Sequence, residues 1–207
     1  MSPNRALPGD MAVVPHFDSA IRGWIVTHQA PAAVAFFVWV SRAGAPRTMY
    51  ILAAAGAVYL WHRRWRRSAA GVILATVGAK AFFEGVKRLV GRQRPPGLGS
   101  VFEGNTYSFP SAHSTASAAV CCALAFAYWR AGIVRGAVAA ALAIGIPLLI
   151  GMSRVYLDAH WATDVFGGWC GGVLIAALCL PLYDGYQHNG RPDTTHAGST
   201  TTHSSAS

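Results

Sequence analysis

The segment SRVYLDAHWATD, residues 153–164, joins two strongly apolar runs, LAIGIPLLIGM (142–152) and VFGGWCGGVLIAALCL (165–180). Both runs have the composition of membrane-embedded helices. A charged side chain at membrane depth is costly unless it is paired or faces water. The segment nevertheless holds an arginine, a histidine and two aspartates within twelve residues. Such a cluster indicates a functional site, whereas a single charge would be compatible with an ordinary polar loop.

The composition favours a membrane protein. Hydrophobic residues make up 53% of the 207-residue chain and charged residues only 12%, against roughly 25% charged residues in soluble domains. The net charge is +9, but the arginines lie at the edges of apolar runs, as in HRRWRR (62–67). That position is typical of membrane anchors. It argues against nucleic-acid binding, which needs a basic face on a soluble fold.

The pattern of apolar runs and breakers predicts an all-α integral membrane bundle of about six transmembrane helices. Residues 1–29 are expected to form an N-terminal segment with an interfacial amphipathic helix over Phe17–Gln29, continuous with a short apolar run from Pro31 and kinked there. Residues 30–183 form the six-span domain, and the polar tail 184–207 is expected to be disordered. The five clear spans are Thr48–Trp61, Ser68–Val90, Ala112–Trp129, Val134–Met152 and Trp161–Leu182.

Six spans place both termini on one side, so three polar segments emerge together at the opposite face: KRLVGRQRPP (87–96), YSFPSAHSTAS (107–117) and SRVYLDAHWATD. Lys87 and Arg94 are seven residues apart and share a helix face if the helix continues that far. Arginine offers a planar fork and lysine a mobile point charge, and both suit phosphate oxygens.

The second segment has the features of an anion site at a helix start. Pro110 restricts Phe109 to an extended conformation, and Ser111 is a good N-cap for the helix that follows. The free amides of Ala112 and His113 then lie at a helix N-terminus, where anions bind readily.

The third segment pairs a histidine with a carboxylate. His160 and Asp164 are four residues apart and fall on one helix face. A carboxylate there holds one ring N–H and leaves the other nitrogen free as nucleophile or base. The same spacing is also compatible with half of a zinc site.

Singly these signals are weak, but together they describe a clamp for phosphate at one membrane face. Its cations are Lys87, Arg94 and Arg154. A membrane protein that only binds or transports a phosphorylated lipid needs the cations but has no use for His113 together with the His160–Asp164 pair. The set therefore favours an enzyme.

Lys-x6-Arg-Pro, Pro-Ser-x-His and Ser-Arg-x5-His-x3-Asp, in this order, resemble the three-part signature of the type 2 phosphatidic acid phosphatase superfamily. That superfamily contains integral membrane lipid phosphatases, soluble acid phosphatases and vanadium haloperoxidases, of which the last are soluble, unlike this chain. The motifs extend from Lys87 to Asp164, and the helix pattern extends the resemblance over residues 30–183 as a catalytic domain. Two positions depart from the pattern, since Ala112 and Asp158 stand where glycine is common.

The resemblance implies that His160 attacks phosphorus and forms a phosphohistidine, and that Asp164 orients its ring. His113 then protonates the leaving group and later activates water. The implied phosphate-binding groups are Lys87, Arg94, Ser111, the backbone of Ala112, and Arg154. No metal or other cofactor is expected.

The expected substrate is a phosphorylated lipid in the cell (plasma or inner) membrane. Polyprenyl diphosphates such as undecaprenyl diphosphate rank first, in recycling of the cell-wall lipid carrier, with phosphatidylglycerophosphate and phosphatidate next. With HRRWRR inside, the active site of this multi-pass protein faces the periplasm or exterior.

Lys80 and Glu84, one turn apart in the third span, raise a smaller question. Either Glu84 neutralises Lys80 at depth and also fixes Lys87, or the two form a surface pair of little energetic weight.

Overall fold

The computed structural model describes residues 15–97 and 107–183, and within these ranges the chain is helical. The all-α membrane fold predicted from the sequence is confirmed. The predicted disordered tail, residues 184–207, lies outside the described residues. In chain order the helices are α1 (His16–Thr27), α2 (Pro31–Ala43), α3 (Pro46–His62), α4 (Arg66–Val90), α6 (Ala112–Arg130), α7 (Gly136–Tyr156), α8 (Ala162–Leu178) and the 3₁₀ turn η1 (Leu180–Leu182).

Helix α6 is the centre of the bundle. It packs against α3, α4, α7 and α8, and 12 of its 19 residues are buried. Its buried face is rich in alanine, serine and threonine, small residues that let helix backbones approach closely inside a membrane. Hydroxyls here bond within the helix: Thr115 Oγ1 donates to the Ser111 carbonyl at 2.9 Å, and Ser117 Oγ donates to the Ser114 carbonyl at 3.2 Å.

Glycines bring α8 against α6. A Cβ added to Gly172 would lie 2.5 Å from the Thr115 carbonyl oxygen, and one added to Gly168 would lie 2.9 Å from the Ser111 carbonyl oxygen. The close approach continues to the start of both helices, where the Ser111 amide donates to the Asp164 carbonyl at 3.0 Å. The glycines thus fix the relative position of two segments that carry predicted site residues.

The outer surface of the bundle suits a membrane. Three segments, α4, α7 and Ala162–Leu182, are long and apolar enough to cross one, and α2 is a shorter apolar helix. Large apolar side chains such as Ile51 and Leu174 are exposed on the outside, at 72% and 57%. In a membrane protein, this exposed apolar layer is the surface that suits contact with lipid chains.

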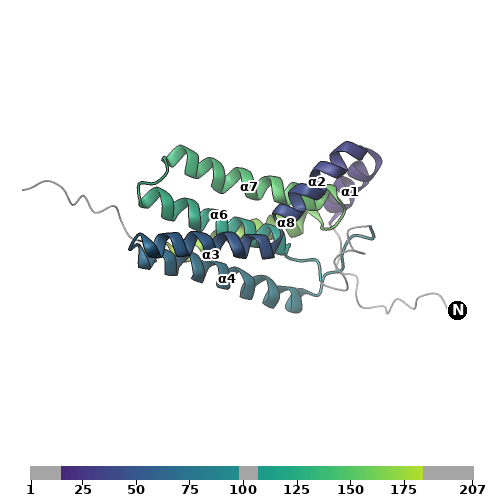
Figure 1. Cartoon of the computed structure of the whole chain (residues 1–207). Coiled ribbons are helices and arrows are strands. Elements are labelled where there is room, and N and C mark those ends of the chain that lie inside the picture. The colour runs from purple at the N-terminus through teal and green to yellow at the C-terminus, as the bar shows by residue number, and fades with distance from the viewer. Residues whose placement is uncertain (1–14, 98–106, 184–207) are drawn as a thin grey trace, which may run out of the picture.

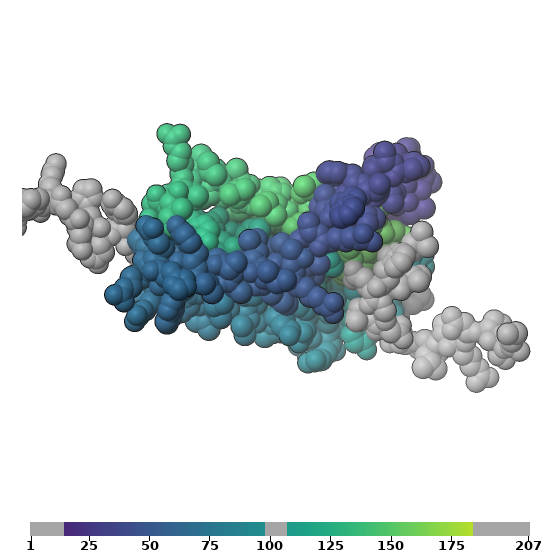
Figure 2. Space-filling model, in the orientation of Figure 1, coloured from purple at the N-terminus to yellow at the C-terminus, as the bar shows by residue number. Residues whose placement is uncertain are grey.

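The N-terminal region differs from the prediction of one helix kinked near Pro31. Helix α1 ends at Thr27 and α2 begins at Pro31, and the residues between them are not helical. The residue before a proline is disfavoured in the helical conformation, and proline is well suited to the first turn of a new helix. Both helices lie at one end of the bundle (Figures 1 and 2), where α1 contacts α7 and α8 and α2 contacts α7.

Helix α1 is amphipathic, as predicted, but its polar face is turned toward the protein. Asp18 is buried and Arg22 is half-buried. Phe17 and Trp24, by contrast, are 63% and 62% exposed. A helix that lies in the membrane interface without docking on the protein would instead direct its charged residues to water. The inward polar face indicates that α1 is held by specific polar contacts.

The Lys80–Glu84 pair is weak. Lys80 Nζ lies 3.9 Å from Glu84 Oε1, and the two side chains are 56% and 43% exposed. The ammonium of Lys87 donates to the Tyr107 carbonyl. This arrangement agrees with a surface pair of little energetic weight, and the tether on Lys87 comes from a different segment.

The α6–α8 contact predicts a position that tolerates no side chain. We expect Gly172→Ala to lower the melting temperature of the detergent-purified protein by several degrees, because overpacking against backbone atoms costs about 1–3 kcal/mol. Gly85→Ala in α4 is the matched control, since a Cβ there meets nothing within 4 Å and alanine favours a helix by roughly 0.5–1 kcal/mol. Equal melting temperatures for the two variants would contradict the close packing of α6 and α8.

Candidate active site

The predicted clamp residues come together at one end of the bundle. Lys87 lies in the last turn of α4, His113 in the first turn of α6, and Arg154 in the last turn of α7. Arg94 and His160 lie in the connections after α4 and before α8. Lys87, Arg94, His113 and Arg154 are all close enough to His160 to lower the pKa of its ring electrostatically. Three segments separated in the sequence therefore share one site.

His160 is almost completely enclosed, with 2% of its surface exposed. Its Nε2 lies 3.0 Å from Arg94 Nη1, and its Nδ1 lies 3.4 Å from Asp164 Oδ2. Since a guanidinium can only donate, Nε2 is the accepting nitrogen and Nδ1 carries the hydrogen. Burial, and then the positive charges of Arg94, Arg154 and Lys87, hold the pKa of His160 well below its ordinary value. The ring is therefore neutral, with a lone pair on the side of the cations.

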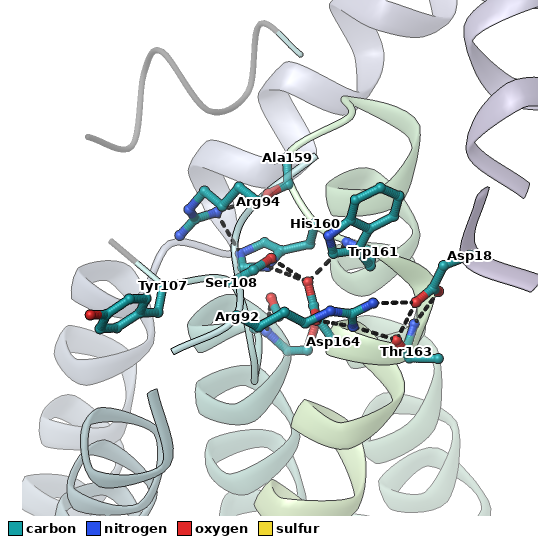
Figure 3. A network of polar contacts seen from close by, with 12 residues as sticks. Asp18, Arg92, Arg94, Tyr107, Ser108, Ala159, His160, Trp161, Thr163 and Asp164 are labelled. Atoms are coloured by element: carbon teal, nitrogen blue, oxygen red, sulfur yellow. Dashed lines mark hydrogen bonds and ion pairs between the residues drawn. The ribbon is translucent and has the colours of Figure 1, made fainter. Parts of the chain in front are cut away.

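Asp164 is held by several donors at once. Its Oδ2 accepts from the Trp161 amide at 3.0 Å and from the Ser108 hydroxyl, and its Oδ1 accepts from Arg92 Nη1 at 2.7 Å (Figure 3). These bonds leave the carboxylate little freedom to rotate. The orientation of the His160 ring is thus fixed by a carboxylate that is itself fixed.

The three clamp cations are positioned by neutral oxygens of the protein. Arg94 Nη1 donates to the Ala159 carbonyl at 2.8 Å, and Arg154 donates to the Ser41 hydroxyl of α2. Lys87 is tethered to the Tyr107 carbonyl, as described above. Because none of these partners carries a charge, the positive field at His160 is not cancelled by them. Burial lowers the pKa of Arg94, while the charge of Asp164 acts in the opposite direction.

The start of α6 has the predicted form. Ser111 is its N-cap, and the Ser111 hydroxyl accepts from the Ser114 amide at 3.5 Å. The amides of Ala112 and His113 are the first two of the helix, so they have no acceptor within it. The side chain of His113 lies near enough to Arg94 and Lys87 to interact electrostatically. These groups can therefore serve an anion that is bound beside His160.

Sequence reasoning missed an outer layer of the site. Arg92 lay unremarked within the segment KRLVGRQRPP (87–96), and Asp18, Ser108 and Thr163 had no assigned role. Arg92 is buried, with Nη1 on Asp164 and Nη2 2.7 Å from Asp18 Oδ2 (Figure 3). The two carboxylates that Arg92 binds, Asp18 and Asp164, are about 146 residues apart in the sequence. No local sequence pattern could therefore have predicted that they share a partner.

Asp158, the departure from glycine, has a structural explanation. Its φ of 52° lies in the left-handed region, which glycine favours and which aspartate tolerates better than most residues. Its carboxylate accepts from Arg22 Nε and Nη2, both at 2.8 Å. The extra carboxylate is thus bound to Arg22 of α1.

In residues 15–97 and 107–183, no three histidine, cysteine, aspartate or glutamate side chains are grouped so that they could hold a metal ion. The His160–Asp164 pair, with Arg92 as the neighbour of the carboxylate, is not part of a zinc site in this region. What the site offers instead is a neutral, oriented imidazole beside several positive charges. That combination is suited to attack on a phosphoryl group.

A sequence model of the PAP2 superfamily matches residues 68–187, which is more than half of the chain. No curated protein sequence matches the chain significantly.

Two solved structures share the fold. One is the transmembrane PAP2-type phosphatidylglycerolphosphate phosphatase of Bacillus subtilis, with a TM-score of 0.66, 24% identity, and coverage of 79% of this chain and 83% of that one. The other is LpxE of Aquifex aeolicus, with a TM-score of 0.65, 21% identity, and coverage of 83% and 98%. The chain therefore belongs to the PAP2 superfamily, and it shares its helical membrane fold with these two structures.

Proposed function

We propose that the enzyme hydrolyses a phosphate monoester or diphosphate of a lipid through a phosphohistidine on His160. The observation that carries this proposal is the state of His160: buried, neutral, held at Nδ1 by Asp164, and with Nε2 directed toward Arg94. A histidine held in this way is a nucleophile with its lone pair already aimed. A protein that only binds or carries phosphorylated lipids would have no need for such a group.

The reaction starts when a phosphate group enters between the cations. Arg94 exchanges its bond to Nε2 for a phosphate oxygen, which frees the lone pair of His160 for in-line attack on phosphorus. Lys87 and Arg154 neutralise the other oxygens as charge builds on them. The Ser111 hydroxyl and the amides of Ala112 and His113 complete the set of donors.

His113 acts on the leaving group. It donates a proton to the departing lipid alcohol or phosphate as the bond to phosphorus breaks. In the second half of the reaction it removes a proton from water, which attacks the phosphohistidine and releases inorganic phosphate. The nitrogen–phosphorus bond breaks, and His160 returns to its neutral form. We propose that no metal ion takes part, since the cations of the clamp supply the positive charge.

A pocket beside the clamp supports a lipid substrate. It has a volume of about 650 Å³ and lies between α1, α2 and the connection that follows α7. Arg154 and Ala159 line it together with apolar side chains that include Val34, Val38 and Leu157. A phosphate held by Arg154 therefore has an apolar space next to it. We propose that the first part of the lipid chain occupies this space.

The named activity of the Bacillus subtilis neighbour, a phosphatidylglycerolphosphate phosphatase, supports a phosphorylated lipid as substrate. By a small margin we rank a polyprenyl diphosphate such as undecaprenyl diphosphate first, because compact six-span relatives often act on such lipids. Phosphatidylglycerophosphate and phosphatidate follow. The active site is proposed to face the periplasm or cell exterior, because HRRWRR (62–67) lies at the opposite end of the bundle.

Substitution of the two histidines is expected to affect the reaction in different ways. His160→Ala should abolish both phosphoenzyme formation and turnover, because His160 is the group proposed to take the phosphoryl group. His113→Ala should lower turnover on the order of 10²–10⁴-fold, the usual range for a missing general acid. The loss should be smaller for a diphosphate, whose phosphate leaving group needs less protonation than an alcohol. The measurements are acid-quench trapping of labelled phosphoenzyme and phosphate release. A phosphohistidine at position 113 in protein that lacks His160 would reverse the two roles.

The substrate order is tested with purified protein in mixed micelles containing EDTA. Phosphate release is measured for undecaprenyl diphosphate, phosphatidylglycerophosphate and phosphatidate at equal surface concentration. We expect the highest kcat/KM for the diphosphate and full activity in EDTA. A soluble phosphate ester that is hydrolysed as well as the lipids would contradict the proposed lipid site. Binding of these lipids without any phosphate release would favour a carrier.

Sidedness is tested by cysteine labelling in a variant without the four native cysteines. Gln93→Cys places a thiol at the site end and Arg63→Cys places one at the other end, and both positions are exposed. In intact cells a membrane-impermeant maleimide should label position 93 and spare position 63. The opposite pattern would place the active site in the cytoplasm.

A further inference from the structure

We propose that Asp18 in α1 is a positioning residue for the reaction: acting through Arg92, it preserves the negative charge that Asp164 presents to His160. This inference rests on the proposed role of His160 as the nucleophile. It assigns to the N-terminal helix a part in catalysis that lies outside the three signature motifs. It also lies outside residues 68–187, the region that the superfamily model matches.

Asp18 is as deeply buried as the catalytic pair, with 1% of its surface exposed. Its Oδ2 accepts from Arg92 Nη2 at 2.7 Å and from Thr163 Oγ1 at 2.5 Å, and its Oδ1 accepts from the Thr163 amide at 3.0 Å. Arg92 uses its other nitrogen on Asp164 Oδ1 at 2.7 Å and on Thr163 Oγ1 at 2.6 Å. Figure 3 shows the resulting chain of contacts, from Asp18 through Arg92 and Asp164 to His160.

The charges along this chain give Asp18 its role. A buried carboxylate needs a partner, and Arg92 supplies one for Asp164. An arginine alone would also cancel most of the field of Asp164, and His160 would then face a pair with no net charge. With Asp18 on the far side of Arg92, the two carboxylates and one guanidinium carry a net charge of −1.

That negative charge acts when the reaction begins. As Nε2 bonds to phosphorus, positive charge develops on the His160 ring, and Nδ1–H faces Asp164. The other charged or titratable groups around His160 are the three clamp cations Lys87, Arg94 and Arg154, with His113 nearby. All of them oppose positive charge on the ring, so the carboxylate side is the only source of compensation among the described groups that act on His160. A neutral Asp164–Arg92 pair would supply much less.

A simpler role for Asp18 is to anchor α1, and the structure offers a control for it. A second ion pair, Arg22 with Asp158, ties α1 to the connection before α8 through two bonds of 2.8 Å. This pair has no bond to Arg92, Asp164 or His160. Asp158→Asn weakens an anchor of α1 by the same chemical change as Asp18→Asn, and asparagine tolerates the left-handed backbone at this position.

The experiment compares Asp18→Asn with Asp158→Asn in the full-length protein in detergent micelles. Phosphoenzyme formation and phosphate release are measured with undecaprenyl diphosphate and phosphatidate. We expect Asp18→Asn to lower kcat about 10–100-fold, the range typical of losing a group that orients a metal-bound histidine, with KM within about threefold of wild type. Asp158 also lines the pocket proposed for the lipid chain, so the two variants are compared by kcat, which Asp158→Asn should change less than threefold at a similar melting temperature. Equal effects of the two variants on kcat, or no effect of Asp18→Asn, would overturn the proposal.

The pH profile separates charge from loss of structure. Attack requires neutral His160, so the rate falls as the pH drops through the pKa of this ring. Removing the charge of Asp18 lowers that pKa further, and no new acidic limb should appear. If Asp18→Asn instead loosens the site and admits water, the pKa rises toward its ordinary value of about 6.5 and an acidic limb appears near that pH. An acidic limb there would show that Asp18 acts only through packing.

Asp18→Glu keeps the charge and covers the case in which Asp18→Asn folds poorly. It should retain more than a tenth of wild-type kcat, and a loss as large as that of Asp18→Asn would overturn the proposal. Failure of the role of Asp18 can be distinguished from failure of the proposed phosphohistidine mechanism. If His160→Ala still releases phosphate, the phosphohistidine mechanism fails, and so does the role of Asp18 in it. If His160→Ala is inactive and Asp18→Asn is fully active, only the role of Asp18 fails.

Discussion

The site depends on one buried carboxylate, that of Asp164. Its backbone carbonyl accepts from the Ser111 amide, which joins the first turns of α6 and α8. Its side chain holds the Trp161 amide, the Ser108 hydroxyl and Arg92, and it lies beside Nδ1 of His160. A charged group with no exposure is tolerated in a membrane bundle only when it is fully bonded in this way. The same bonds that make its burial possible therefore also position the proposed nucleophile.

Much of this site follows from the sequence. Lys87, Arg94, Arg154 and His160 were expected to meet, because short-range rules place each of them at the end of a helix and alternating spans bring those ends to one face. The N-cap at Ser111 follows from residue type and spacing alone. Helix periodicity predicts where each helix ends, and alternating spans predict which ends share a membrane face. Together these two rules are sufficient to locate a clamp of this kind.

The contacts that the sequence did not predict are those between distant segments. The bond from Arg92 to Asp18 spans 74 residues and the one from Arg22 to Asp158 spans 136. For α1 the pattern of apolar and polar residues was recognised, but not which face turns inward, since a helix at a membrane surface and a helix docked on polar loops have the same periodicity. The ion-pair partners of Asp18 and Arg22 show that α1 is docked on the protein. Such partners cannot be predicted from the spacing of apolar and polar residues.

Five basic residues at the site end fall into two kinds. Arg22 and Arg92 are matched by carboxylates, whereas the described partners of Lys87, Arg94 and Arg154 are neutral oxygens or the imidazole of His160. A bound phosphate supplies the negative charge that these described neutral partners of the second kind lack. The distinction has a cost in stability, because like charges held together repel one another. That repulsion is reduced when an anion binds, so the affinity of the site for phosphate and the stability of this end of the bundle are linked. A chain that neutralised its clamp internally would fold more easily and would have nothing left with which to hold its substrate.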